Sequence, residues 1–363
     1  DTTMKWWSEA QIVFANANMS SLFKECSALT DISGVGTWDT SKVVTMAYLF
    51  SGCTSLENID VLQNWKTESV TNLEYLFEHC EKITNINALK NWNVSKVTTI
   101  RYLLSYCTNI TDISALSTWD ISNVNSIIGL FNYCENLSDI TAIENWNTSK
   151  VTNISYLFTK CTKLTDLSAL AKWHTANVES MGYTFQDCIN LTNINALNKW
   201  DVSNVTYMGH TFRHCESLTD ISALANWNTS KVTGMDRMFL SCSSLKNINA
   251  LQNWNVKSVT NMSYMFQYCS KLTDASGAND WNINNVTDFL QMCYKCPTHP
   301  EFTTRKGAWD SEGTFIPWTG LYLIYNANGG SFDADSTIAE NKIAYQWLPV
   351  DNKNGLVEGS YIE

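Results

Sequence analysis

The sequence predicts an α/β repeat solenoid in which each 27-residue unit forms one coil, with one short parallel strand and one helix or helical turn. Tryptophan recurs every 27 residues, at Trp38, Trp65, Trp92, Trp119, Trp146, Trp173, Trp200, Trp227, Trp254 and Trp281. Cysteine keeps the same interval from Cys26 to Cys296. An uninterrupted period of this size indicates stacked coils, since one unit cannot bury its apolar face alone.

The first half of each unit has the spacing of an amphipathic helix. Counted from the tryptophan, apolar residues stand at positions 5, 8, 11, 12 and 15, as in Val151, Ile154, Leu157, Phe158 and Cys161. Steps of three and four place these side chains on one helical face. The Ser or Thr that precedes them, as in "TSKV", is a candidate helix N-cap.

The second half of each unit has the spacing of a strand. In "LTDISAL", Ile and Ala two residues apart point to one side of a strand, and the polar residues between them point outward. With the Asn that often follows, the unit reads L-x-x-I-x-A-x-x-N, close to the leucine-rich-repeat pattern. At the strand spacing of about 4.8 Å, eleven coils give a body roughly 50 Å long.

Deviations from the period set the domain boundaries. We expect an N-terminal cap at residues 1–18, the solenoid at 19–296, a C-terminal cap or linker at 297–318, and a small β-rich segment at 319–363. Gln11 stands where a tryptophan is due, and Pro297 and Pro300 end the pattern.

The unit "WNTSKVTNISYLFTKCTKLTDLSAL" (146–170) resembles the BspA-like leucine-rich-repeat surface proteins, and the resemblance extends over about residues 19–296. It implies a right-handed solenoid, a secreted bacterial protein at the cell surface or cell wall, a role in adhesion, and no catalytic residues. "YNANGG" near residue 325 resembles the start of an internalin-type B repeat, which belongs to the same compartment.

Composition narrows the classes of partner. The 363 residues are 44% hydrophobic and 16% charged, with a net charge of −11. An acidic chain without a basic cluster is unsuited to nucleic acids and to anionic membrane surfaces. No apolar stretch approaches the length of a membrane span. We expect a monomer without a cofactor or metal.

The cysteine and tryptophan ladders each have two interpretations. Because every unit repeats them in phase, we expect Cys26 to Cys269 to be buried free thiols, and the tryptophans to be core residues rather than a sugar-binding platform. At the C-terminal end, Cys293, Cys296 and His299 leave open a local disulfide or part of a zinc site.

Candidate binding residues lie where units carry polar or aromatic side chains. Tyrosines at position 10, such as Tyr156 and Tyr183, either cover the core edge or present rings to a partner. The outward strand row containing Asp112, Asp139 and Asp166 is either a solvated face or a binding face. His210, Arg213 and Arg237 stand at outward positions where units differ most, which is where selective docking or neutral drift is expected.

No catalytic motif accompanies these residues, so we expect a non-enzyme. The leading hypothesis is an adhesion or interaction protein that binds a host protein, a matrix protein or a glycan over a solenoid face. The alternative is a structural spacer that displays another domain away from the cell wall.

Overall fold

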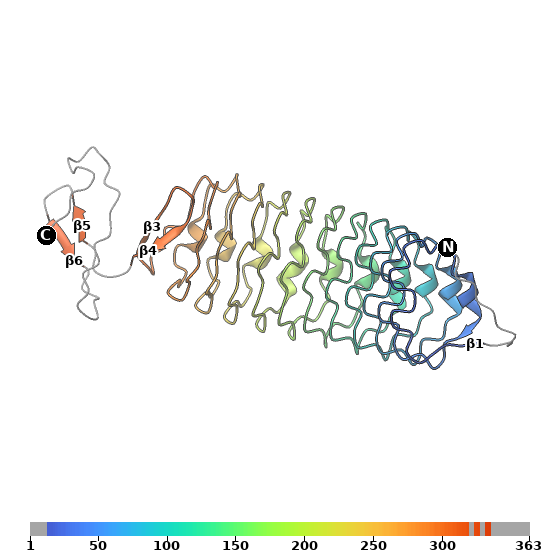
Figure 1. Cartoon of the computed structure of the whole chain (residues 1–363). Helices are drawn as coiled ribbons and strands as arrows, with labels where there is room; N and C mark the ends of the chain where they lie inside the picture. The colour runs from blue at the N-terminus through green and yellow to red at the C-terminus, as the bar shows by residue number, and fades with distance from the viewer. Residues whose placement is uncertain (1–12, 319–322, 327–330, 335–363) are drawn as a thin grey trace.

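The chain forms a long stack of similar coils (Figure 1). The computed structural model describes residues 13–318, 323–326 and 331–334. Within them, each unit runs once around the stack and returns 27 residues later beside its own starting point, which confirms a repeat solenoid. Within the described residues, no helix is long and apolar enough to cross a membrane.

Each coil carries one short 3-10 helix on the same side of the stack. These elements are η1 (Ser33–Thr37), η2 (Asp60–Asn64), η3 (Asn87–Leu89), η4 (Ser114–Thr118), η5 (Thr141–Ile143), η6 (Ser168–Leu170), η7 (Asn195–Lys199), η8 (Ser222–Leu224), η9 (Asn249–Leu251) and η10 (Ser276–Ala278). They occupy the "SAL" stretch in which the sequence predicts a strand, so that prediction is wrong. The Asp or Asn two residues before each 3-10 helix accepts a bond from its first N–H, as Asp112 does from Ser114 at 2.7 Å. This local turn chemistry overrides the strand pattern.

The predicted helix between positions 5 and 15 is also wrong, because that segment is a succession of tight turns. In one coil, the N–H groups of Ile154, Tyr156, Phe158 and Lys160 donate to carbonyls of the next coil at 2.7–3.1 Å. The intervening N–H groups of Leu157 and Thr159 donate to the third residue before them. Half of the backbone donors are therefore used between coils, whereas an α-helix would use them internally.

Coil spacing explains why turns replace the helix. Packed α-helices need about 8–10 Å between their axes, whereas hydrogen-bonded extended segments lie about 4.8 Å apart. Parallel bridges join the residues at position 7 of successive coils, from Asn18 through Thr45 and Asn72 to Asp288. A helix in every coil would force the coils apart at this ladder, so the backbone turns instead.

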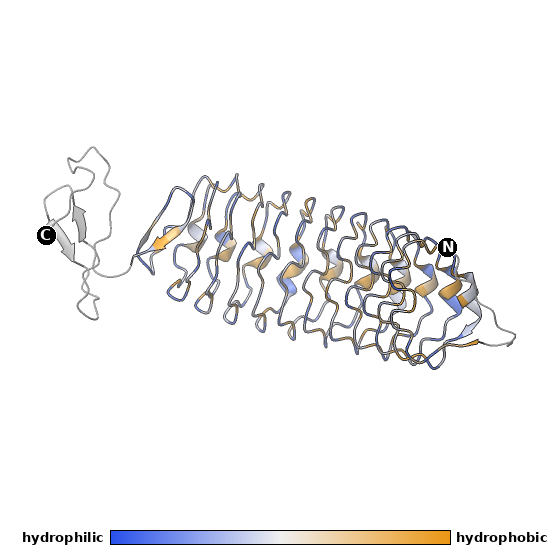
Figure 2. Ribbon diagram, in the orientation of Figure 1, coloured by the Kyte–Doolittle hydropathy of each residue, from blue (hydrophilic) through white to orange (hydrophobic). Residues whose placement is uncertain are grey.

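The core runs the length of the stack. Hydrophobic and hydrophilic residues alternate around each coil (Figure 2). The tryptophans from Trp65 to Trp281 are at most 5% exposed, and the phenylalanines at position 12 are fully buried. Each of these tryptophans donates its indole N–H to the carbonyl of the residue 30 positions earlier, for example Trp173 to Ile143 at 3.0 Å. The tryptophan ladder is thus a core feature, as expected.

The ends of the stack differ from its middle. β1 (Val13–Phe14) pairs in parallel with β2 (Trp38–Asp39). At the other end, β3 (Gly307–Trp309) pairs antiparallel with β4 (Phe315–Pro317), and the Arg305 guanidinium donates to the Val286 carbonyl at 2.8 Å. Residues 297–318 thereby cover the last coil.

The predicted β-rich segment at 319–363 lies mostly outside the described residues, as do residues 1–12 of the predicted N-terminal cap. Within that segment, β5 (Leu323–Asn326) and β6 (Ser331–Ala334) form an antiparallel pair.

Candidate functional site: a tyrosine-lined groove

Two left-handed backbone positions in each coil build the candidate site. The residues at positions 10 and 14 have positive φ, as at Tyr156 (φ 61°) and Lys160 (φ 64°). A left-handed conformation costs a residue with a side chain about 1–2 kcal/mol. The hydrogen bonds between coils hold the conformation, and the stack aligns equivalent side chains into two rows. We call them the first row (position 10) and the second row (position 14).

Aromatic rings in the first row stack on one another along the solenoid. Tyr48, Tyr75 and Tyr102 form one stack, with centroids 4.4 and 4.9 Å apart. Tyr156, Tyr183 and His210 form another, with centroids 4.3 and 4.1 Å apart. Between the two stacks the row reaches Gly129, which has no side chain.

The second row carries its own stack opposite this interruption. His79, Tyr106 and Tyr133 stack with centroids 4.0 and 4.2 Å apart. The Lys160 ammonium lies 5.3 Å from the centre of the Tyr133 ring. The stack of the second row therefore ends with Tyr133, in the coil in which the first row is broken at Gly129.

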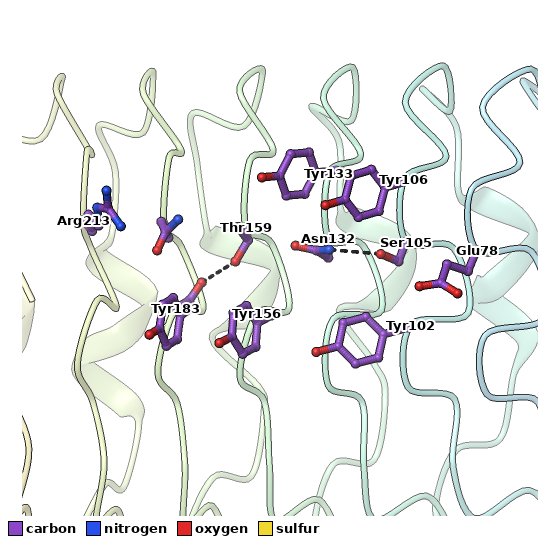
Figure 3. A pocket seen from close by; sticks show the side chains of 11 residues that line it. Glu78, Tyr102, Ser105, Tyr106, Asn132, Tyr133, Tyr156, Thr159, Tyr183 and Arg213 are labelled. Atoms are coloured by element: carbon purple, nitrogen blue, oxygen red, sulfur yellow. Dashed lines mark hydrogen bonds between the residues drawn. The ribbon is translucent and has the colours of Figure 1, made fainter. Parts of the chain in front are cut away.

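A groove of about 370 Å³ lies between the rows (Figure 3). Tyr102, Tyr156 and Tyr183 form one wall, and Tyr106 and Tyr133 form the other. The floor consists of the residues at position 13 of six successive coils: Glu78, Ser105, Asn132, Thr159, Gln186 and Arg213. Five coil steps correspond to a length of about 24 Å.

The floor combines satisfied and unsatisfied polar groups. Asn132 donates to Ser105 at 3.0 Å, and Thr159 donates to the Tyr183 carbonyl at 2.6 Å. Gln186 donates its amide N–H to Asp187 at 3.0 Å, which fixes the orientation of the amide. The Gln186 Oε1 and Arg213 Nε atoms are buried, and neither has a hydrogen-bond partner among the described residues. Buried polar atoms normally have partners, and these two are exceptions that the protein itself covers.

Three of the groove tyrosines have raised pKa values. Burial raises the pKa of Tyr156 to about 12 and also raises the pKa of Tyr102 and Tyr106. Their phenol groups therefore stay protonated at neutral pH, when each can donate and accept a hydrogen bond.

The structure distributes the candidate residues over two faces. Tyr156, Tyr183 and Arg213 line the groove. His210 and Arg237 continue the first row beyond it, and the Arg237 guanidinium lies 4.3 Å from the centre of the Tyr264 ring. The outward placement expected for His210 is wrong, because only 6% of this residue is exposed.

A buried polar cluster explains the position of His210. Its Nε2 lies 3.3 Å from Asp236 Oδ2, and burial lowers the pKa of His210 although Asp236 opposes this shift. Beside it, the Tyr207 ring fills space that is open only because Gly182 and Gly234 lack side chains. The cluster holds the last ring of the stack formed by Tyr156, Tyr183 and His210.

The aspartates of the other face have a local structural task. Asp112, Asp139 and Asp166 each accept a bond from the first N–H of a 3-10 helix, at 2.7–2.8 Å. They lie on the 3-10 side of the coils and do not line the groove.

The cysteine ladder is buried, as expected, from Cys53 to Cys269, whereas Cys26 is half-buried. Each ladder thiol from Cys53 to Cys269 donates to the carbonyl of the residue 30 positions earlier, for example Cys161 to Phe131 at 3.3 Å. Burial raises the pKa of Cys107 to about 12. Cys293 and Cys296 are free thiols in this structure, and the His299 ring stacks on Trp309 at 4.7 Å. Within the described residues, no group of three or more His, Cys, Asp or Glu side chains is arranged to hold a metal ion.

Sequence reasoning missed half of the groove. The residues missed are Tyr106, Tyr133 and the position-13 residues other than Arg213. They lie in the segment predicted to be helical, and in a helix positions 10, 13 and 14 do not form a groove. Two signals were present in the sequence: aromatic residues at position 14 in consecutive units, and Gly129 in place of a tyrosine.

Comparisons with known proteins found a similar solved structure and a matching sequence family. No curated protein matches the chain. Among solved structures, a leucine-rich cell surface protein from Faecalibacterium prausnitzii A2-165 is similar, with a TM-score of 0.34 and 20% identity over 69% of this chain and 74% of that chain. Its identity and TM-score are too low to indicate what this chain binds.

A family defined by sequence covers most of the stack. It matches residues 17–141, 105–220 and 189–309, three overlapping segments that together span nearly all the coils. The chain belongs to the family described as Mycoplasma protein of unknown function, DUF285.

Proposed function

We propose that this chain is a non-catalytic interaction protein, displayed at the cell surface, that binds an extracellular partner through the tyrosine-lined groove. The observation that carries the proposal is the groove itself, which combines five tyrosines with a floor of six different polar side chains. Ligand sites typically combine aromatic walls with a few placed polar groups, and tyrosine is enriched in protein-binding sites. The surface location rests on the sequence resemblance to BspA-like proteins.

The groove also differs from the rest of the stack in a way that favours selectivity. Core positions repeat from coil to coil, whereas position 13 changes from Glu78 to Ser105, Asn132 and onward to Arg213. Repeat proteins commonly bind over such an extended face, to which several units contribute different side chains.

A double variant tests the proposal. Tyr106→Ala with Tyr133→Ala removes one wall of the groove, and binding to immobilised extracellular-matrix proteins and glycans is measured by surface plasmon resonance. The matched control is Tyr264→Ala with Tyr268→Ala, which changes the two row positions of a single coil outside the groove. We expect the groove variant to lose binding and the control to keep it. Equal binding by the two variants would place the site elsewhere.

The alternative of a structural spacer is supported by the unbroken ladder of bridges from Asn18 to Asp288. A spacer needs only length and stiffness. The spacer hypothesis therefore predicts that the wild-type stack binds no ligand. Absence of binding across the whole matrix-protein and glycan panel would favour it.

A further inference from the structure

We propose that Cys296 is an oxidation site at the C-terminal end of the cysteine ladder, where a hydroperoxide such as hydrogen peroxide converts it to a disulfide with Cys293. The site lies outside the groove and does not depend on the proposed function. Three features of the last ladder coil (residues 281–296) carry the inference: a second cysteine at position 12, a tight turn that joins the two thiols, and partial exposure of Cys296.

The last ladder coil contains a second thiol. Position 12 holds a buried phenylalanine in most coils, such as Phe239 and Phe266, and Cys293 takes that place. Cys293 is the only cysteine of the chain outside the ladder. Its thiol contacts the Cys296 sulfur, which also contacts the thiol of Cys269. The Cys296 sulfur therefore has two thiol neighbours, one in its own coil and one in the previous coil.

The turn between Cys293 and Cys296 suits a disulfide. The Cys296 N–H donates to the Cys293 carbonyl at 3.0 Å, and Lys295 between them has φ 60°. The Cα atoms at the two ends of such a turn lie less than about 7 Å apart, and disulfides join Cα atoms about 4.4–6.8 Å apart. Because the two thiols already contact one another, a disulfide can form with little change of the backbone.

Cys269 is a poorer partner for Cys296, although their thiols are also in contact. The two residues hold the same position in successive coils, so their parallel Cα–Cβ bonds keep the Cβ atoms about 4.8 Å apart. Disulfides need a Cβ separation of about 3.5–4.5 Å. The same arrangement recurs between other ladder neighbours, for example Cys26 and Cys53, so it does not distinguish Cys296.

Partial exposure and a lowered pKa make Cys296 the thiol that reacts first. Cys296 is half-buried and follows the exposed Lys295, whereas Cys293 is only 5% exposed. Hydrogen bonds from the Cys269 and Cys293 thiols lower the pKa of Cys296 although burial opposes them. Burial raises the pKa of Cys293. The thiolate is the nucleophilic form of cysteine, and an accessible thiolate beside a second cysteine is typical of oxidation-sensitive sites.

The reaction has two balanced steps. The neutral Cys296 thiol donates to the Phe266 carbonyl at 2.9 Å, and it first loses that proton to the solvent. The thiolate attacks one oxygen of hydrogen peroxide and the O–O bond breaks. The released hydroxide takes up a proton, which gives a sulfenic acid and water. The Cys293 sulfur then attacks the sulfenic sulfur, the S–O bond breaks, and the Cys293 proton leaves with the hydroxide as a second water. Two thiols are oxidised and one peroxide is reduced.

Cys26 supplies a matched control within the same chain. It is the other half-buried cysteine of the ladder. It has a ladder neighbour in Cys53, but position 12 of its own coil is Phe23 rather than cysteine. If exposure alone decided reactivity, Cys26 and Cys296 would react alike. The second cysteine in the turn is the feature that distinguishes Cys296.

The measurement treats the reduced chain with hydrogen peroxide, blocks the remaining thiols with N-ethylmaleimide, and maps the cysteines by mass spectrometry of a non-reduced digest. We expect a Cys293–Cys296 disulfide that forms at least about tenfold faster than Cys26 is oxidised, because a larger thiolate fraction speeds the attack. In Cys293→Ser, dimedone should trap Cys296 as the sulfenic acid. In Cys296→Ser, Cys293 should keep its thiol.

Three results would overturn the proposal. Oxidation of Cys26 and Cys296 at equal rates would show that exposure alone decides reactivity. A Cys269–Cys296 disulfide would make the ladder neighbour the partner. Absence of a disulfide in the wild-type chain, after peroxide has oxidised Cys26, would show that the turn does not close. The wild-type map alone decides all three, so the test holds even if one of the variants does not fold.

Discussion

Replacing Trp173 by Phe isolates one connection between coils. Trp173 is 4% exposed, and its ring stacks on Trp200 with centroids 6.5 Å apart. Its indole N–H donates to the Ile143 carbonyl at 3.0 Å. That carbonyl also accepts a bond from the Trp146 backbone N–H at 3.2 Å, so the substitution removes one of its two partners and does not leave it empty.

The size of the effect follows from two contributions. Loss of a hydrogen bond whose acceptor keeps another partner costs about 1 kcal/mol. Aromatic side chains bury about 150–250 Å² each, so exchanging Trp for Phe gives up on the order of 50 Å², or about 1.3 kcal/mol. We therefore expect Trp173→Phe to lower the free energy of unfolding by about 2 kcal/mol.

Urea unfolding followed by far-ultraviolet circular dichroism measures this loss. Because repeat arrays can unfold in parts, hydrogen exchange of the amide protons in the coils on either side of Trp173 checks that the loss is local. Benzothienylalanine at the same position keeps the ring size without the N–H group, and it should cost about 1 kcal/mol. A cost below about 0.5 kcal/mol for both replacements would refute the role assigned to the tryptophan ladder.

Three further predictions concern other parts of the stack. Ellman's reagent should leave Cys53 to Cys269 unmodified in the native protein and modify them after denaturation, because these thiols are buried and burial raises their pKa values. Rapid modification of these thiols in the native state would contradict their burial. Asp112→Ala should lower the free energy of unfolding by about 1 kcal/mol, because Asp112 loses its hydrogen bond to a backbone N–H. Ligand affinity should stay unchanged. Lost affinity with unchanged stability would make the aspartate row the binding face. Burial lowers the folded-state pKa of His210 below its value of 6.5 in the unfolded chain, so the stability that its neutral form contributes is present above pH 6.5 and is lost as pH falls. His210→Phe should remove that part of the acid sensitivity in urea titrations between pH 7 and 5, and an unchanged pH profile would count against it.

The sequence by itself determined the solenoid, its period and most of its core. Trp173, Cys161 and their equivalents recur every 27 residues, which predicts a stack of similar coils. In such a stack, residues repeated at a constant interval occupy equivalent places. Burial of the tryptophans and of Cys53 to Cys269 follows from the same regularity. None of these inferences depended on the secondary structure of a coil.

Only the tertiary structure decided the backbone within each coil, and with it the groove. Apolar steps of three and four suit an α-helix and also suit a run of tight turns, so periodicity could not separate the two. Hydrogen bonds to the next coil distinguish the turns from an α-helix. The N–H of Tyr156, for example, donates to the carbonyl of Gly182, a contact that a local sequence pattern does not reveal. Those bonds hold positions 10 and 14 in the left-handed conformation. The rows of tyrosines, and the interruption at Gly129 between them, exist because neighbouring coils hold each other in place.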